Sequence, residues 1–313
     1  MTIPSSATVA VIGAGSVGAS VCASLLQDGC ARQILLIDVN DDLCKGQAMD
    51  LADGNFVTDS KIRQGTWVEA AASSIIVITA GAKQKPQETR NQLLERNSKI
   101  INDICDKLMP ISSTTIVLIV SNPVEVMSGI FQHISGLPAN RVIGSGTYLD
   151  SMRFRDAIAK RVSIAASSVH AYVVGEHGEL QVPLISSAMI CGVPVLNFPE
   201  LDDKVLGEIA AETPRRAYDI IALKGSTYYG IAMSVLRMCN SIIGDRHQVF
   251  CNSVLSQEFE TYLSLPCVIG RMGVVQILPA SFSQAEKEGL KIAADAIKQR
   301  IDYLKTLFSV ITK

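Results

Sequence analysis

The sequence predicts an α/β protein, with a doubly wound parallel sheet in its first half and a second, mixed α+β domain after it. Apolar stretches of strand length alternate with segments of helical periodicity up to about residue 144. A glycine-rich turn directly follows the first of these stretches, and from about residue 145 the alternation is lost. We therefore expect domains over residues 1–144 and 145–313, packed tightly because no low-complexity linker separates them.

The first strand, from about Val9, leads into a G-x-G-x-x-G turn. Gly13 permits the tight turn, Gly15 lets the backbone approach a pyrophosphate, and Gly18 lets the following helix pack closely. The N-terminus of that helix, at Val17, presents free N–H groups and a partial positive charge to the phosphates. A glycine turn of this spacing, set between strand and helix, predicts a Rossmann βαβ unit that binds a dinucleotide.

A second apolar strand ends at Asp38, twenty residues after the last glycine of the turn. A carboxylate at this position accepts hydrogen bonds from a ribose 2′-hydroxyl. Its charge repels a 2′-phosphate, and Val39 and Asn40 supply no arginine to receive one. The sequence therefore predicts an NAD-binding Rossmann domain over residues 1–144, with NAD favoured over NADP.

The remaining elements of the first domain place a loop at the ligand-binding edge of the sheet. Residues 81–90 are polar, include a proline and follow an apolar strand, so they predict a loop at its carboxyl end. The expected elements are helices over 41–52 and 91–108 and strands over 61–66, 74–80 and 115–120.

In the second domain, a helix over 149–161 and an alternating strand over 168–174 precede the loop Gly175-Glu-His-Gly178. Short β segments are expected between about residues 247 and 277. Further helices are expected over 204–223, 227–243 and 284–308.

Composition argues against several classes of partner. The formal net charge is −2, and lysine and arginine form no long block, which argues against nucleic acid or a membrane surface. The eight cysteines are scattered and form no C-x-x-C pair, so neither a metal site nor a disulfide framework is indicated. No signal pattern or membrane span is evident, and we expect a cytosolic protein.

His177 is the histidine best placed for chemistry, because flanking glycines after an apolar strand can present its ring into a cleft. A surface or hydrogen-bonded core histidine remains the alternative. Asp150 and Arg153 stand three residues apart at the start of a helix, so both can project into one site. An exposed intrahelical ion pair explains that spacing equally simply. Arg90 alone is a surface arginine.

Together, several segments resemble the L-lactate/malate dehydrogenase family, in the family's order and over nearly the whole chain. The segments are residues 80–90 (AGAKQKPQETR), 121–124 (SNPV), 144–155 (GSGTYLDSMRFR), 175–178 (GEHG) and 224–231 (KGSTYYGI).

The resemblance implies hydride transfer between a nicotinamide and a 2-oxo acid, with residues 145–313 as the substrate domain. His177 is implied as the acid/base and Asp150 as its partner. Arg153 would bind the substrate carboxylate through two hydrogen bonds. Arg90 would close over the substrate and polarise its carbonyl. Other matched positions are Asn122, near nicotinamide and substrate, and the pocket residues Thr227 and Ile231.

Substrate choice depends on Gln84, which matches the position facing the C3 substituent of the substrate. Malate dehydrogenases have an arginine at this position, which pairs with the second carboxylate of their substrate. The neutral Gln84 would leave that carboxylate without a counter-charge, which is costly in a closed pocket. We therefore expect lactate dehydrogenase activity. Malate dehydrogenase remains an alternative, since Lys83 and Lys85 flank the position. A dehydrogenase of a bulkier L-2-hydroxy acid remains open as well.

This chain departs from the family pattern at several positions. Gln87 replaces a loop glycine, Glu125 replaces an aspartate, and Glu179-Leu180 replaces Asp-Ser or Asp-Thr. These changes bear on rate more than on reaction type. Arg155 and His170 match a fructose 1,6-bisphosphate site of bacterial lactate dehydrogenases, but family members without that regulation share the pair. The family suggests a homotetramer, with a dimer as the second choice.

Other classes of protein fit less well. Short-chain dehydrogenases need a Tyr-x-x-x-Lys pair, and zinc-dependent dehydrogenases need clustered cysteine and histidine ligands, and neither pattern is present. A non-catalytic structural protein on this fold is the remaining alternative. Such a protein is expected to have lost part of the set Arg90, Asp150, Arg153 and His177, yet all four are present.

Overall fold

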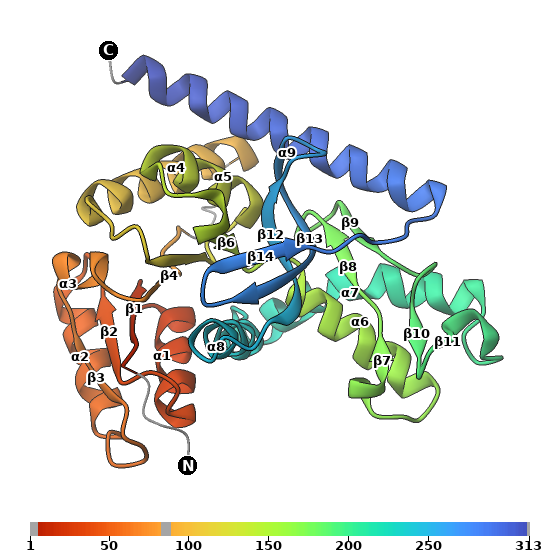
Figure 1. Ribbon diagram of the computed structural model, residues 1–313, viewed down its shortest axis with the longest axis horizontal. Helices are drawn as coiled ribbons and strands as arrows, with labels where there is room; N and C mark the ends of the chain where they lie inside the picture. The colour runs from red at the N-terminus through yellow and green to blue at the C-terminus, as the bar shows by residue number, and fades with distance from the viewer. Residues whose placement is uncertain (1–5, 83–88, 312–313) are drawn as a thin grey trace.

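The computed structural model describes residues 6–82 and 89–311 (Figure 1). A large sheet carries parallel strands in its first half, in the order β3-β2-β1-β4-β5-β6. This is the strand order of a dinucleotide-binding domain, and the predicted doubly wound fold is confirmed. The strands are β1 (Thr8–Ile12), β2 (Gln33–Ile37), β3 (Lys61–Gln64), β4 (Ile75–Ile78), β5 (Ile116–Ile119) and β6 (Val142–Gly144).

Helices cover both faces of this parallel sheet, and the central strands are therefore apolar throughout. Every residue of β4 and of β5 is buried. The helices are α1 (Ser16–Asp28), α2 (Asp41–Ala52), α3 (Trp67–Ala71), α4 (Arg90–Leu108) and α5 (Val124–Ser135). Local caps begin several of them: the side chain of Asn40 accepts a hydrogen bond from Leu43 N at α2, and Thr89 with Gln92 forms a capping box at α4. The short helix α3 had no counterpart among the sequence-based expectations, because five residues show no helical period.

The strand expected over 168–174 is wrong as a single element. It divides into β7 (Val169–His170), in a small sheet with β10 (Met189–Ile190) and β11 (Val193–Pro194), and β8 (Val173–Gly175), in the large sheet. Side chains of the helix over residues 148–161 bond to two backbone groups here, one between the two strands and one where β8 begins. Arg155 Nε donates to the carbonyl of Ala171 at 2.7 Å, and Val173 N donates to Ser151 Oγ at 2.9 Å. Two backbone groups are thus paired at the point where the chain changes sheets.

The large sheet continues into the second half of the chain as antiparallel strands, in the order β6-β12-β13-β8-β9. The expected short β segments are in fact longer: β12 (Gln248–Ser256) and β13 (Thr261–Gly270) form one extended ladder, followed by β14 (Gly273–Ile277). Buried polar residues interrupt their apolar pattern, and tertiary hydrogen bonds hold some of their polar groups, as when Asn252 Nδ2 donates to the Gly144 carbonyl at 2.7 Å. Strand β9 spans Gln181–Pro183.

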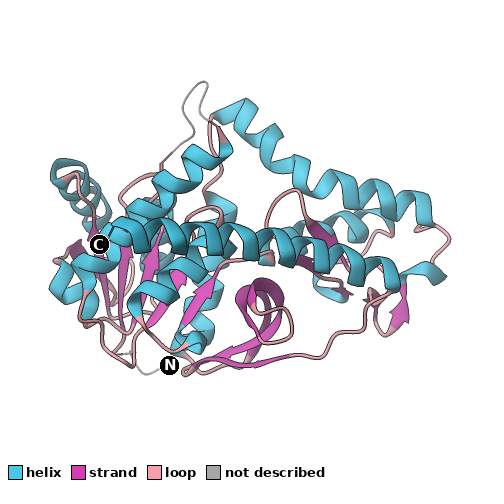
Figure 2. Ribbon diagram, turned by 90° about the horizontal axis from the view of Figure 1, so that it is seen from above, coloured by secondary structure: helices cyan, strands magenta, loops and turns pink. Residues whose placement is uncertain are grey.

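Long helices surround this second half and connect it to the first. They are α6 (Tyr148–Arg161), α7 (Asp203–Lys224), α8 (Tyr229–Ile243) and α9 (Gln284–Ile311), with 3-10 turns η1 (Ala139–Arg141), η2 (Ala166–Ser168) and η3 (Val195–Asn197). Helix α9 runs along much of the molecule's length and packs against both α5 and β13 (Figure 2). Helix α1 packs against α8. The expected tight packing of the two halves is confirmed.

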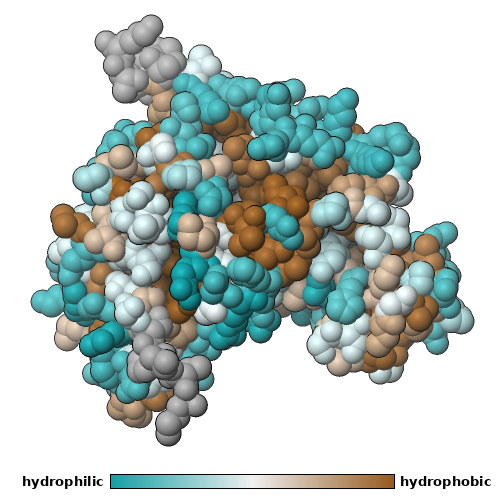
Figure 3. Space-filling view, in the orientation of Figure 1, coloured by the Kyte–Doolittle hydropathy of each residue, from teal (hydrophilic) through white to brown (hydrophobic). Residues whose placement is uncertain are grey.

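The surface of the second half has an apolar centre. Figure 3 shows it over the strands β12 to β14. Val249, Val275 and Ile277 of these strands remain more than one-third exposed. Of the helices within the described residues, none combines the length and the apolar character that crossing a membrane requires.

Candidate active site

The glycine turn after β1 has the geometry that its spacing predicts. Gly13 has φ +112°, and a Cβ on this residue would lie 2.7 Å from Thr79 Oγ1. A Cβ on Gly18 would lie 1.8 Å from the Gly13 carbonyl oxygen, so only glycine allows α1 to pack here. Around Gly15, in contrast, no atom of the described residues lies within 4 Å of such a Cβ. The open space beside Gly15 and the free N–H groups at the start of α1, including that of Val17, form a cradle suited to a pyrophosphate.

Asp38 lies at the end of β2, directly beside this turn. Its Oδ2 accepts a hydrogen bond from the backbone N–H of Ala14 at 2.6 Å, and its Oδ1 accepts one from Asn40 N at 2.9 Å. The first contact connects the carboxylate to the glycine turn 24 residues earlier. Ala14 thus helps to orient Asp38, a role that no sequence pattern indicated.

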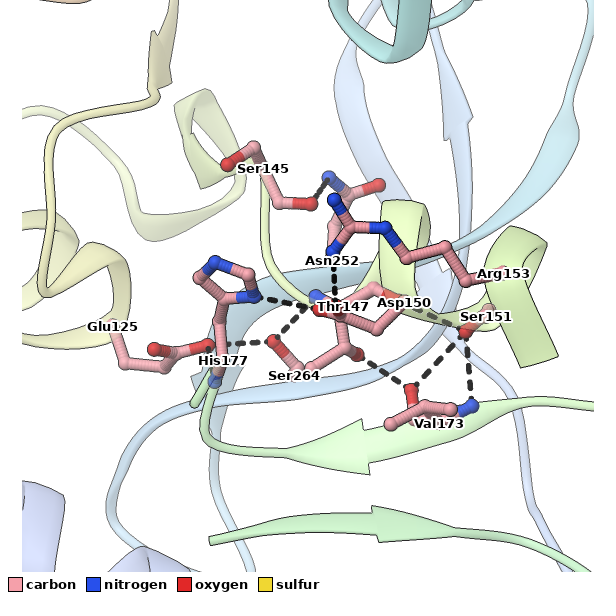
Figure 4. Close-up of polar contacts among 10 residues, drawn as sticks. All are labelled: Glu125, Ser145, Thr147, Asp150, Ser151, Arg153, Val173, His177, Asn252 and Ser264. Atoms are coloured by element: carbon pink, nitrogen blue, oxygen red, sulfur yellow. Dashed lines mark hydrogen bonds and ion pairs between the residues drawn. The ribbon is translucent and has the colours of Figure 1, made fainter. Parts of the chain in front are cut away.

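The structure brings His177, Asp150 and Arg153 together (Figure 4). The loop after β8 presents the His177 ring, whose Nδ1 lies 2.6 Å from Asp150 Oδ2. Arg153 Nη1 donates to the other oxygen of Asp150 at 3.1 Å. Asp150 is 1% exposed, whereas the His177 side chain keeps 29% of its surface accessible. The alternative of an exposed intrahelical ion pair is therefore wrong, because the pair is buried and contacts a histidine.

These contacts set the protonation of the site. Burial by itself lowers the pKa of His177, but the charge of Asp150 and its hydrogen bond outweigh burial and raise that pKa to about 9. Burial by itself raises the pKa of Asp150, but His177 and Arg153 together hold the pKa of this carboxyl below its usual value. These shifts favour an imidazolium paired with a carboxylate at neutral pH, an arrangement that can donate a proton.

Glu125, in the first turn of α5, lies on the other side of His177 and is fully buried. Its Oε1 accepts hydrogen bonds from His177 N at 3.1 Å and from Ser264 Oγ at 2.7 Å. Burial raises the pKa of Glu125 to about 7, against the lowering effect of the His177 charge and these hydrogen bonds. In the sequence, Glu125 stood out only as a departure from the family's aspartate. Its contact with His177 was not evident there, because Glu125 and His177 are 52 positions apart.

Arg153 also lines a cavity of about 420 Å³. Thr227 and Ile231 lie in its wall, as expected for pocket residues, and Arg216 and Lys224 add positive charge that the sequence reasoning did not foresee. The cavity thus offers cations to an anionic substrate together with an apolar surface. The other lining residues are Leu149, Met152, Asp156, Ile220, Tyr228, Tyr229 and Gly230.

Asn122 lies at the carboxyl end of β5, at the edge of the sheet where the loop over 81–90 begins. Its backbone carbonyl accepts a hydrogen bond from Asn97 Nδ2 at 2.9 Å. The Oδ1 atom of Asn97 accepts from Ala82 N at 2.8 Å. Asn97 therefore joins the base of the loop to the Asn122 segment, and sequence reasoning missed it because the side chain lies mid-helix in α4.

Other predicted positions are placed as follows. Gln84, with Lys83, Lys85 and Gln87, lies outside the described residues, and Arg90 is described only as the first residue of α4. Arg155 donates to Ala171 and lies over the Tyr172 ring, 4.6 Å from its centroid. His170 is exposed on β7 and pairs with Met189 across the small sheet. Within residues 6–82 and 89–311, no group of three or more His, Cys, Asp or Glu side chains is arranged to hold a metal ion.

Comparison with known proteins gives matches over most of the chain. Residues 7–144 match the family model described as lactate/malate dehydrogenase, NAD binding domain, and residues 147–307 match its alpha/beta C-terminal domain. An L-lactate dehydrogenase of Kosmotoga olearia is 41% identical over 307 residues, covering 94% of this chain and 95% of that protein. One from a Thermoanaerobacter species is 40% identical over 306 residues, covering 95% and 98%.

Solved structures agree with these relatives. A lactate dehydrogenase from a Medee basin deep-sea metagenome library superposes with a TM-score of 0.92 at 32% identity, covering 96% of this chain and 99% of that one. The minor L-lactate dehydrogenase of Enterococcus mundtii gives 0.92 at 32% identity, covering 95% and 98%. The glycine cradle with Asp38 fits the dinucleotide that such a domain binds. This chain belongs to the lactate/malate dehydrogenase family and carries the family's NAD-binding domain.

Proposed function

We propose that this protein is an NAD-dependent L-lactate dehydrogenase, which reduces pyruvate to L-lactate and catalyses the reverse reaction. The observation that carries the proposal is the contact of His177 with Asp150, beside an arginine that lines a cavity. Relatives about 40% identical over nearly the whole chain bear the same name. The proposal assigns residues 1–144 to cofactor binding and residues 145–313 to substrate binding.

In this proposal, His177 donates its proton to the carbonyl oxygen of pyruvate while that carbon receives a hydride. When bound, NADH supplies the hydride, and NAD⁺ accepts it in the reverse direction. Asp150 orients the ring and stabilises its charged form. Arg153 holds the substrate carboxylate, for which its planar guanidinium is suited.

The remaining proposed roles follow the family resemblance. Arg90 polarises the substrate carbonyl, and Asn122 lies near nicotinamide and substrate. Thr227 and Ile231 form the wall of the substrate pocket, in agreement with their place in the cavity. The cofactor residues are Gly13, Gly15, Val17, Gly18 and Asp38, with Asn122.

Pyruvate is the proposed substrate because Gln84 offers no counter-charge to a second carboxylate. One observation favours malate dehydrogenase as the second candidate: Arg216 and Lys224 line the cavity and carry the positive charge that oxaloacetate requires. The deciding experiment measures kcat/KM for NADH oxidation with pyruvate and with oxaloacetate, side by side at neutral pH. A strong preference for pyruvate supports the proposal. A preference for oxaloacetate rejects it, and loss of that preference in Arg216→Ala or Lys224→Ala would identify the cation responsible.

We further propose a cytosolic homotetramer. The apolar residues exposed on β12 to β14 support association of subunits, because large exposed apolar patches commonly mark interfaces. Sedimentation of the purified protein tests this, and a monomer at micromolar concentration contradicts it. An anion site at Arg155 and His170 is a secondary proposal, tested by adding fructose 1,6-bisphosphate to the assay.

A further inference from the structure

Glu125 connects three parts of the fold behind the His177 ring. It begins α5, its Oε1 accepts the backbone N–H of His177, and it also accepts the hydroxyl of Ser264 on β13. The same Ser264 oxygen accepts a hydrogen bond from Thr147 N at 3.2 Å, one residue before α6 begins. The loop that presents His177 is therefore attached, through one carboxylate, to the strand and helix that frame the site.

The second oxygen of this carboxylate has no such support. Glu125 Oε2 is buried and, within the described part of the chain, has no hydrogen-bond partner. A buried negative charge is costly unless a positive charge lies close to it. The Asp150 charge on the far side of the ring is already shared between His177 and Arg153. The charge that can balance Glu125 is the imidazolium of His177.

We propose that Glu125 is a positioning residue for the proton donor: it holds the His177 backbone in place, and its buried charge favours the protonated ring. The inference rests on the proposed function in assigning His177 the proton transfer. His177 thus lies between two carboxylates, with Asp150 bonded to its ring and Glu125 bonded to its backbone (Figure 4).

The charged surroundings agree with this assignment. From α6, Asp150 and Arg153 face His177, with opposite charges. The neighbouring Glu176 pairs with Arg300 of α9, so its charge is balanced within that pair. In the described residues, the charged group that acts on Glu125 is His177. The two groups therefore titrate as a pair, and removing the charge of one changes the pKa of the other.

The test compares the pH dependence of kcat/KM in both directions for the wild type and Glu125→Gln. The amide oxygen of glutamine can still accept the hydrogen bonds from His177 and Ser264, but the charge is lost. Pyruvate reduction needs a protonated ring and lactate oxidation needs a neutral one. We expect the alkaline pH limit of reduction and the acid pH limit of oxidation both to move down by about half a unit, which is about a threefold change in the acidity constant of the ring. Unchanged pH limits, with a loss of the same size at every pH, would overturn the proposal, because a purely structural defect lowers the rate without changing the pKa of the ring.

Two further variants serve as controls. Glu286→Gln removes another buried carboxylate that accepts several hydrogen bonds, from Ser186 and Ser283, far along the chain in α9. It is expected to leave the pH limits unchanged. Glu125→Asp keeps the charge but shortens the side chain, and it should shift the limits by less than half as much as Glu125→Gln. A shift as large as that of the glutamine variant would contradict the role of the charge.

A measurement independent of activity separates this inference from the proposed function. The chain has four histidines, so the His177 ring can be assigned in NMR spectra by comparison with His177→Gln and titrated without cofactor. A lower midpoint in Glu125→Gln supports the role of Glu125 even if the protein does not act on lactate. An unchanged midpoint overturns it even if the protein does.

Should Glu125→Gln fail to fold, the wild-type protein still gives an answer. In protein labelled with ¹³C at the glutamate carboxyls, one carboxyl is expected to titrate near pH 7, and its midpoint should change in His177→Gln. If no glutamate midpoint changes in His177→Gln, the inference is overturned, because the two charges then do not act on each other.

Discussion

The Nδ1 atom of His177 lies 2.6 Å from Oδ2 of Asp150, although the two residues are 27 positions apart. The contact joins the loop after β8 to the first turn of α6, so the ring of His177 is held by a helix as well as by its own loop. A pairing of this kind fixes the tautomer of the ring and stabilises its charged form.

Replacing Asp150 by asparagine is therefore expected to lower kcat/KM for pyruvate reduction by about 10²- to 10⁴-fold. The asparagine amide neither stabilises an imidazolium nor enforces the correct tautomer. The matched control is Asp245→Asn, which alters an exposed aspartate–histidine pair with His247 at 3.3 Å. Steady-state kinetics of both variants checks the prediction, and a loss below threefold in Asp150→Asn would contradict it.

Arg153→Lys is expected to raise KM for pyruvate by about 10- to 100-fold, because lysine cannot make two parallel hydrogen bonds to a carboxylate. Arg153 is 12% exposed and lines the cavity, so solvent does not replace the lost bond. Arg161→Lys, an exposed position in the last turn of the same helix, should leave KM unchanged. If the two variants behave alike, Arg153 does not bind the substrate.

Alanine substitutions at the glycines 15, 18 and 46 should have different effects on stability and on cofactor affinity. Gly18→Ala is expected to destabilise the protein strongly, because its Cβ would lie 1.8 Å from a carbonyl oxygen. Gly15→Ala has room to fold but fills the space of the pyrophosphate, so NADH affinity should fall at least about tenfold. Gly46→Ala, in the open interior of α2, should stabilise by up to about 1 kcal/mol. Thermal unfolding and NADH fluorescence titration distinguish the three outcomes.

The free energy of unfolding should decrease as the pH rises from about 6.5 to 9. The pKa of His177 is raised from 6.5 to about 9 in the folded protein, so its contribution is fully present below 6.5 and is lost as the pH passes the folded value. This rise corresponds to about 3 kcal/mol at most. Urea unfolding at both ends of this range checks the prediction. In His177→Gln the decrease should be smaller by about that amount, and an equal decrease in both proteins would rule out His177 as its source.

Local sequence carried enough information for the βαβ unit that begins the first domain. The strand, glycine turn and helix up to Asp38 fold as the spacing predicts, because backbone sterics at Gly13 and helical periodicity act over short distances. The same holds for α2, whose predicted bounds of 41–52 coincide with those observed, since a cap and acidic first turn define its start. His177, Asp150 and Arg153 were identifiable as candidates by residue type and position.

The assembly of His177, Asp150 and Arg153 into one site could not be predicted from the sequence, because it depends on contacts between distant segments. Helix α6 satisfies the backbone around Ala171 and so divides one expected strand between two sheets. Packing of α5 against the His177 loop brings Glu125 to a backbone 52 positions away, and packing of α7 against α6 lines the cavity with Arg216. Periodicity and turn chemistry reach only a few residues along the chain, whereas burial and charge compensation arise from whichever segments meet in three dimensions.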